Sequence, residues 1–367
     1  MEPDQLLYTL ALQHVPNLGD STAKKLIRHF GSAENVFKEK KSSLLKIDGI
    51  GKTRISEIEN PIHLKEAEKE LGFIQKNKIS VSYFKEESYP EKLKHCQDSP
   101  LLLFSRGAID LSRKRILSIV GTRQISSHGI SFCEQLIEDL APLEPVIISG
   151  FAYGTDITAH KAAIRNKLQT VACLAHGLNQ IYPKAHKKYM TEMEENGGFF
   201  TDFWSTDTFD RNNFLKRNRI IAGLSEATVV IESAEKGGAL VTADITNSYD
   251  REVFAVPGRP GDKSSIGCNE LIKSQNARVL TSAADIAYML NWRNIEHDLK
   301  PVQKKLFIDL GPEEKLLYDQ LQLQGKTELD LLALQCKIPT FKTASLLLSM
   351  ELKGAVRPLP GKLFEIA

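Results

Sequence analysis

Residues 145–163, PVIISGFAYGTDITAHKAA, show the pattern from which the architecture of most of this chain can be predicted. It begins with an apolar run, passes through two glycines and continues into a segment with the composition of a helix. Nearly continuous apolar runs of this length are typical of strands that are buried on both faces of a parallel sheet. Similar runs recur about 25 to 30 residues apart: RILSIVG from 115, TVACLAHG from 170, GGFFTD from 197, ATVVIES from 227, EVFAVPG from 252 and ARVLTS from 277.

This spacing leaves room for one helix between successive strands. It therefore predicts an α/β fold with an extended, Rossmann-like parallel sheet that helices cover on both faces. Right-handed crossovers place the carboxyl ends of all such strands at one edge of the sheet, where ligands bind. The residues that follow the strands are therefore the first candidates for a functional site.

Three of the predicted strands end in turns rich in glycine. The run from 115 is followed by Gly121, Thr122 and Arg123, the run from 145 ends at Ser149–Gly150, and the run from 227 leads to Gly237–Gly238. Glycine lets the backbone approach a ligand closely, and the helix that follows offers unpaired amides to an anion. A single glycine could be present only because strand–helix turns favour this residue. Three such turns at one edge of the sheet predict an anion site.

The sequence offers little support for enzyme chemistry at this edge. It lacks the GxxxxGKS or GxxxxGKT pattern of a Walker NTPase, the GxGxxG fingerprint of dinucleotide binding and the GxSxG nucleophile elbow. His160 and His176 are more simply explained as helix-capping or packing residues, and Asp156 and Asp244 as residues that favour helix N-termini. We therefore predict no enzyme activity, no cofactor and no metal.

A dense cluster of positive charge stands before the run from 227. Arg211, Lys216, Arg217 and Arg219 lie within nine residues that contain no carboxylate, and Phe214 lies among them. A basic groove with an interleaved aromatic ring suits a single nucleic-acid strand, because cations bind the backbone and a ring face stacks on a base.

The segment FLKRNRIIAGLS, residues 214–225, should form a helix on the rim of the sheet. Ile220, Ile221 and Leu224 would face the sheet, and the cations would face the groove together with Lys161 from the helix after the second turn. A basic helix face that merely contacts solvent is the alternative.

The flanking parts predict two smaller domains. VPNLGDSTAKKLI from Val15 and IDGIGKTRISEIE from Ile47 form a weak repeat, with Gly19 and Gly51 at equivalent places before a helix. This pattern is typical of a helix–hairpin–helix, which could touch DNA or simply form a small helical bundle. Residues 312–367 predict three helices and a two-stranded hairpin about a Pro-Gly turn, which is a winged helix. The expected domains are residues 1–75, 76–295 and 296–367, the last including a charged linker.

The third tail helix has a polar face at positions 342, 345, 349 and 353, which are Lys, Ser, Ser and Lys. This face could touch phosphates, but it lacks the arginine and asparagine that usually contact base edges. The tail is therefore expected to contact proteins or to bind a DNA backbone weakly.

Composition sets further bounds on the chain. With 42% hydrophobic and 26% charged residues and a net charge of +2, it is globular, and any nucleic-acid partner must bind a local patch. Its five cysteines lie far apart, which fits a reducing cytosol rather than a disulfide framework. The N-terminal segment lacks the features of a signal peptide, and no window has 18 apolar residues, so a cytoplasmic protein without a membrane span is expected.

Eight motifs then identify a resemblance. The chain resembles the DNA processing protein A family (DprA, also called Smf) over about residues 80–290. The motifs follow in the family's order: YPEKLKHCQDSPLLLFSRG, VGTRQISSHG, SGFAYGTDITAHKAAI, GLNQIYPKAH, FLKRNRIIAGLSEATVVIES, KGGALVTA, REVFAVPG and GCNELIKSQNA.

The resemblance implies a bacterial protein that binds incoming single-stranded DNA during natural transformation, protects it and loads the RecA recombinase onto it. Such proteins form homodimers and are not known as enzymes. The resemblance and the glycine turns and cations at the carboxyl edge of the sheet together predict a set of DNA-binding residues. They are Gly121, Thr122, Arg123, Ser149, Gly150, Lys161, Arg211, Phe214, Lys216, Arg217, Arg219, Gly238 and Asn269.

Two departures from the family's motifs and two rival functions accompany this prediction. GFAYGTD has Tyr153 where the family commonly has arginine, and KGGALVT lacks a serine that is frequent between the glycines. One rival is a Rossmann-type enzyme that holds a mononucleotide phosphate and uses an acid such as Glu232. The other is a transcription regulator that binds duplex DNA through the tail.

Overall fold

The computed structural model describes residues 2–47, 49–112, 114–292, 310–353, 355–359 and 362–366. The chain forms two compact units, Met1–Asn294 and Ile295–Ala367. The predicted boundary between residues 75 and 76 falls within the first unit and stays a prediction. The predicted linker falls almost wholly outside the described residues.

Six helices begin the first unit: α1 (Pro3–His14), α2 (Asp20–Phe30), α3 (Ala33–Lys38), α4 (Lys41–Leu44), α5 (Lys52–Ile58) and α6 (Ile62–Lys76). Gly19 and Gly51 stand immediately before α2 and α5, as the repeat predicted. The helices bury an apolar core that includes Leu26, Ile27 and Ile58, and this core continues into the sheet through Phe104 and Phe199. The helical part is thus packed directly against the sheet.

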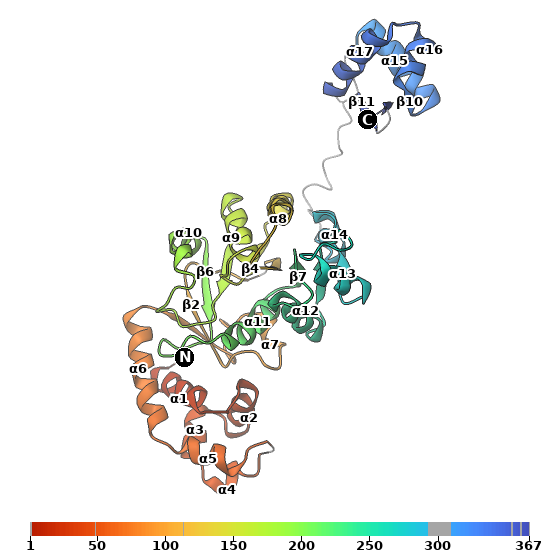
Figure 1. Cartoon of the computed structure of the whole chain (residues 1–367). Helices are drawn as coiled ribbons and strands as arrows, with labels where there is room; N and C mark the ends of the chain where they lie inside the picture. The colour runs from red at the N-terminus through yellow and green to blue at the C-terminus, as the bar shows by residue number, and fades with distance from the viewer. Residues whose placement is uncertain are drawn as a thin grey trace. The chain divides into compact units, whose positions relative to one another are not determined.

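A nine-stranded sheet forms the centre of the first unit (Figure 1). Its order is β1-β2-β6-β5-β4-β3-β7-β8-β9. The strands are β1 (Ser80–Tyr83), β2 (Leu102–Arg106), β3 (Ile116–Val120), β4 (Val146–Ser149), β5 (Thr170–Cys173), β6 (Gly197–Thr201), β7 (Ala227–Val230), β8 (Glu252–Ala255) and β9 (Arg278–Val279).

The predicted parallel sheet is confirmed from β3 to β9, where every described pair of neighbouring strands is parallel. The sequence did not predict that β1 and β2 extend it. Both strands come from the segment between the helical part and β3. β2 pairs in antiparallel register with β6, and β1 pairs in antiparallel register with β2.

Helices cover both faces of the sheet. One face packs against α11 (Asn212–Leu224), α12 (Gly238–Ser248) and α13 (Ile266–Lys273), and the other against α8 (Ser127–Leu140), α9 (Thr155–Arg165) and α14 (Ala283–Met289) (Figure 1). Successive residues of a strand point to opposite faces of the sheet. Ile116 therefore packs on the face that α11, α12 and α13 cover, and Leu117 packs on the face that α8, α9 and α14 cover. As predicted, Ile220, Ile221 and Leu224 of α11 face the sheet.

Short helices complete the first unit: α7 (Glu91–Lys94), the 3-10 helices η1 (Ala141–Leu143) and η2 (Lys184–Tyr189), and α10 (Met190–Glu195). Of these, η2 and α10 lie between β5 and β6. Because η2 follows the carboxyl end of β5, its lysines lie toward the same edge of the sheet as the glycine turns.

The second unit is a winged helix, as predicted. It contains α15 (Pro312–Gln324), β10 (Thr327–Glu328), α16 (Leu329–Cys336), α17 (Thr340–Leu352), β11 (Val356–Leu359) and β12 (Leu363–Ile366). Its small sheet is antiparallel, with the order β10-β12-β11. The Pro-Gly turn predicted for the hairpin lies outside the described residues. Among the helices described in either unit, none has the length and apolarity needed to cross a bilayer.

Candidate nucleic-acid interface

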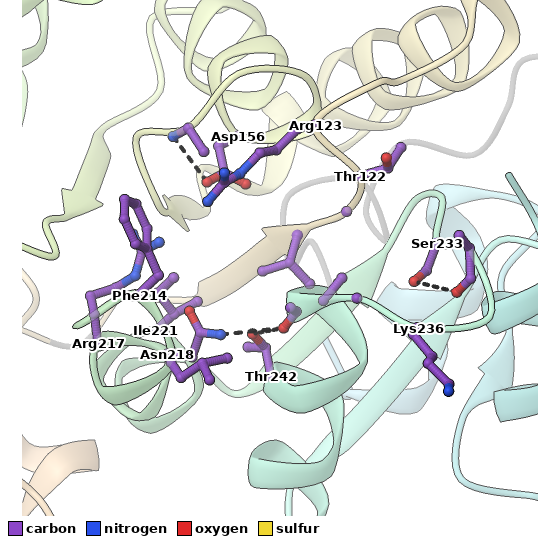
Figure 2. Close-up of a pocket in the computed structure, with 18 of the residues that line it drawn as sticks. Thr122, Arg123, Asp156, Phe214, Arg217, Asn218, Ile221, Ser233, Lys236 and Thr242 are labelled. Carbon is purple, nitrogen blue, oxygen red and sulfur yellow. Dashed lines mark hydrogen bonds between the residues drawn. The ribbon is translucent and has the colours of Figure 1, made fainter. Parts of the chain in front are cut away.

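A pocket opens at the carboxyl edge of the sheet, where the turns after β3 and β7 meet α11 (Figure 2). The strand order puts β3 between β4 and β7, so the chain leaves β3 toward one side of the sheet and later returns to the other. Ligands of open α/β sheets bind at such a topological switch point. The pocket is lined by these residues, among others: Gly121, Thr122, Arg123, Asp156, Arg211, Phe214, Arg217, Asn218, Ser233, Lys236, Gly237, Gly238 and Thr242.

Backbone hydrogen bonds fix the turns that form the pocket. The Thr122 amide donates to the Glu232 carbonyl at 2.8 Å, and the Thr155 amide donates to the Thr122 carbonyl at 3.1 Å. The turn after β3 is thereby tied to the segment after β7 and to the start of α9. Close packing explains Gly121, since a Cβ there would collide with the side chain of Thr155.

Two arginines from different elements converge on one aromatic ring. The guanidinium carbon of Arg123 lies 5.0 Å from the centroid of the Phe214 ring, and that of Arg217 lies 5.9 Å from it. Arg123 belongs to the turn after β3, whereas Phe214 and Arg217 belong to α11 (Figure 2). The arrangement puts two cations and a ring face in one pocket.

Arg217 forms the floor of this pocket and is only 5% exposed. Its Nη1 donates to the Cys173 carbonyl at the end of β5, while its buried Nε has no hydrogen-bond partner among the described residues. Burial lowers the pKa of the Arg217 guanidinium, and the nearby Asp156 carboxylate opposes that effect. Gly150 makes room for it, since a Cβ there would collide with both side chains.

Asp156 brings a carboxylate into the pocket, which the sequence explained only as a helix N-terminal residue. Burial raises its pKa, and the charge of Arg217 partly offsets this shift. Its Oδ2 accepts a hydrogen bond from the Ala152 amide at 3.2 Å. Figure 2 shows Asp156 beside Arg123, so this carboxylate faces both arginines of the pocket.

The far wall of the pocket is the start of α12. Gly237 precedes the helix, and Asn218 of α11 donates from Nδ2 to the Gly238 carbonyl at 3.2 Å (Figure 2). Asn218, Ser233, Lys236 and Thr242 were not among the predicted site residues, although all lie within or beside the motifs quoted above. No local signal in the sequence marks these four residues as lining a pocket.

Arg219 is the clearest correction to the predicted site. It ion-pairs with Asp202 and with Asp20, the latter at 3.0 Å, and it donates to the backbone carbonyl of Asp98. Burial alone would lower its pKa, but Asp202 and Asp20 hold the pKa of the guanidinium above its usual range. The expectation that this cation faces the same groove as Arg217 is wrong, because two residues turn an α-helix by roughly 200°.

Lys216 shares that other side of α11. It lines a second pocket together with Asp20, Asp98, Asp202, Asp207 and Arg219. The predicted basic cluster is therefore divided by the helix, with Arg211, Phe214 and Arg217 in the first pocket and Lys216 and Arg219 in the second.

Besides Gly150, three other predicted residues lie outside the lining of the first pocket. Ser149 is buried and donates to the Ile119 carbonyl at 2.5 Å. Asn269 exchanges two hydrogen bonds with the backbone of Gly258, at 3.0 and 3.1 Å. Lys161 is exposed on α9. The first two side chains hold the scaffold together, and any DNA contact by these three residues stays a prediction.

The groups that a catalytic interpretation would use are engaged elsewhere. Glu232 accepts hydrogen bonds from the amide and hydroxyl of Ser126, at 2.9 and 2.5 Å, and so caps the start of α8. His160 contacts the Gly150 carbonyl at 2.6 Å and the Thr170 hydroxyl at 2.7 Å, and burial lowers its pKa to about 4. Across the described parts of the chain, no group of three or more His, Cys, Asp or Glu side chains is arranged to hold a metal ion.

Comparison with known proteins gives consistent results. Residues 80–291 match the family model of DNA recombination-mediator protein A, and residues 308–362 match the model of the DprA winged helix domain. Protein Smf of Synechocystis sp. is 30% identical over an alignment of 363 residues, and the match covers 94% of this chain and 83% of that protein.

The solved structures that resemble the chain include two of DNA processing protein A. The X-ray structure of DNA processing protein A from Streptococcus pneumoniae has a TM-score of 0.64 and 29% identity, and the match covers 78% of this chain and 98% of that one. DNA processing protein A from Helicobacter pylori, described for its single-stranded DNA binding mode, has a TM-score of 0.52 and 26% identity. That match covers 58% of this chain and 95% of the other.

Proposed function

We propose that this chain, which belongs to the DNA recombination-mediator protein A family, binds single-stranded DNA in the pocket at the carboxyl edge of its sheet. One observation carries the proposal: Arg123 and Arg217 converge on the ring of Phe214. Single-strand binding needs cations for the phosphates and a ring face for a base, and this pocket offers both.

The binding should be largely indifferent to sequence. Guanidinium groups, glycine amides and a ring face interact with phosphates and with the π-faces of bases, which all nucleotides share. The start of α12 adds backbone amides at Gly237 and Gly238, where an anion is favoured. The expected ligand is therefore a phosphate polymer with accessible bases rather than a duplex sequence.

We further propose that the protein acts in the cytoplasm as a homodimeric recombination mediator that protects the strand and loads RecA onto it. Family membership supports this role. The engagement of Glu232 and His160 in the scaffold supports a binding protein rather than an enzyme.

Competition experiments test the proposed ligand. A labelled oligothymidine bound to the full chain is displaced by unlabelled strands of increasing length, by thymidine monophosphate and by duplex DNA. We expect displacement to strengthen with strand length and the mononucleotide to compete poorly. A mononucleotide that competes as well as a strand would instead support the enzyme with a mononucleotide site.

The mediator role needs a separate assay. RecA filament formation is followed on single strands coated with single-strand-binding protein, with and without this chain. We expect the chain to accelerate filament formation and the Arg123→Ala variant to accelerate it less. Strand binding without any acceleration would retain the DNA-binding proposal and refute the loading role.

A further inference from the structure

A cluster of three aromatic rings begins in the pocket and extends beyond it. The centroid of the Phe214 ring lies 5.7 Å from that of Phe209 and 6.0 Å from that of Tyr182, and the last two lie 4.7 Å apart. Phe209 is 44% exposed and Tyr182 is 40% exposed. Neither residue lines the pocket, so two exposed aromatic residues lie beside it.

The sheet topology places these two rings along the same carboxyl edge. Tyr182 lies in the segment that follows β5, and Phe209 lies in the segment that follows β6. Their loops are joined by hydrogen bonds from Asn179 Nδ2 to the Ser205 carbonyl at 2.7 Å and from Gln180 Nε2 to the Asp207 carbonyl at 3.4 Å. The rings are thus held together before any ligand arrives.

Exposed cations lie close in sequence to both Tyr182 and Phe209. Lys184, Lys187 and Lys188 of η2 are exposed immediately after Tyr182, and Arg211 is exposed immediately after Phe209 and Asp210. Within the parts of the chain that the structure describes, no carboxylate forms an ion pair with these four side chains. Asp210 is the nearest carboxylate in sequence, and its Oδ1 accepts from the Asn212 amide at the start of α11.

The opposite direction is unfavourable for a phosphate backbone. On the other side of α11, the second pocket combines the carboxylates of Asp20, Asp98, Asp202 and Asp207 with the cations Lys216 and Arg219. Arg219 is already paired with two of these carboxylates. A negatively charged strand is repelled by such a surface and attracted by the lysines of η2.

From these contacts we infer that the strand continues from the pocket onto a strip formed by Tyr182, Phe209 and the lysines of η2. The inference rests on the proposed single-strand binding and adds the path that the strand follows. The nucleotide in the pocket stacks on Phe214, the neighbouring bases stack on Phe209 and Tyr182, and their phosphates lie near Lys184, Lys187 and Lys188.

A series of oligothymidines that grows one nucleotide at a time tests the strip. The affinity of each strand is measured by fluorescence anisotropy for the unmodified chain and for Tyr182→Ala combined with Phe209→Ala. We expect the shortest strands that bind to be unaffected and longer ones to bind at least about fivefold more weakly to the variant, as expected for lost base stacking.

Three outcomes would contradict the inference in different ways. Equal affinities at every length would refute the strip but leave binding in the pocket intact. An equal loss at every length, including the shortest strand, would mean that the two rings only support Phe214, and the strip would again be refuted. If the unmodified chain bound no strand at all, the proposed function itself would fail.

Controls separate stacking from folding. Phe209→Trp and Tyr182→Phe retain the rings and should retain affinity at every length, and thermal unfolding of each variant checks its fold. Tyr288 on α14 is 84% exposed and lies outside the strip, so Tyr288→Ala should behave like the unmodified chain. Photocrosslinking with iodouracil at successive positions should mark Phe209 or Tyr182 next to the pocketed nucleotide. Crosslinks only to residues of the second pocket would overturn the proposed path.

Discussion

Each side of α11 carries a largely buried arginine, but the two arginines have different surroundings. Arg217 faces the first pocket, where it contacts the Phe214 ring and the Cys173 carbonyl and retains a buried nitrogen that has no partner among the described residues. Arg219 faces the second pocket, where Asp20 and Asp202 neutralise it. The difference shows that an arginine's environment, rather than its presence in a motif, indicates whether its charge is available to a ligand.

The side of Arg219 is a junction within the fold. Asp20 belongs to α2, and its Oδ1 also accepts from the Leu101 amide at 2.7 Å. Nearby, Gln13 and Trp204 share a hydrogen bond of 2.9 Å, and Glu70 accepts from the Ser205 amide at 2.9 Å. These contacts join the N-terminal helices to the sheet, so charge on this side of α11 serves stability.

The strongest test of this comparison is Arg219→Ala. Its removal leaves two largely buried carboxylates without their cation, and breaking such a pair typically costs about 3–5 kcal/mol. We expect the free energy of unfolding, measured in urea, to fall by about that amount, while the folded variant keeps its affinity for single strands. Arg211→Ala, at an exposed position, should change the unfolding free energy by no more than about 0.5 kcal/mol. A stable Arg219→Ala variant that had lost DNA binding would reverse the comparison.

Acidification should weaken the scaffold beneath the first pocket. His160 supports the Gly150 carbonyl, and its folded-state pKa of about 4 lies below its ordinary value of 6.5. Above pH 6.5 the His160 imidazole is neutral in both the folded and the unfolded protein. Between pH 6.5 and 4 it gains a proton only in the unfolded protein. Stability should therefore fall as the pH falls through this window, by roughly 3 kcal/mol in total.

Urea unfolding across this pH window measures the effect, and His160→Gln provides the comparison. Burial also lowers the pKa values of His176 and His186, so a part of the pH dependence should remain in the variant. An identical pH dependence in the two proteins would show that His160 is not responsible.

Phe214→Ala examines the pocket without removing a charge. Loss of one stacked base should reduce the binding free energy of a short oligothymidine by about 1–3 kcal/mol, measured by fluorescence anisotropy. Phe214→Trp keeps a ring face and serves as the matched control. Unchanged affinity in the alanine variant would mean that the ring only orders Arg123 and Arg217.

The smallest expected effect concerns the salt dependence of binding. Arg123→Ala removes one phosphate contact, so the slope of log affinity against log salt should become shallower by about 0.7. Arg123 is a cleaner choice than Arg217, whose burial links it to the fold. Lys161 lies outside the pocket lining, so Lys161→Ala tests its predicted DNA contact separately, and an unchanged slope would refute that contact. A comparable change for Lys161 would extend the site onto α9.

Much of this site could be predicted because its signals are local. Glycines after apolar strands indicate close backbone approaches, and Gly121, Thr122, Arg123, Arg211, Phe214, Arg217 and Gly238 do line one pocket. Asn218 and Lys236 could not be selected in this way, because nothing in their local sequence distinguishes a lining side chain from a solvated one. Tyr182 and Phe209 meet only because β5 and β6 are neighbours in the sheet.

Local sequence patterns were sufficient to predict the parallel sheet, the glycine turns at its edge, the winged helix and a basic segment before β7. The spacing of apolar residues and the backbone freedom of glycine are properties of short segments. They have the same effect in any fold that buries the apolar runs. The folded arrangement alone shows which arginine lines the first pocket and which lines the second. Arg219 meets Asp20 across 199 residues of sequence, and a charge separated so far from its partner cannot be paired until the chain has folded.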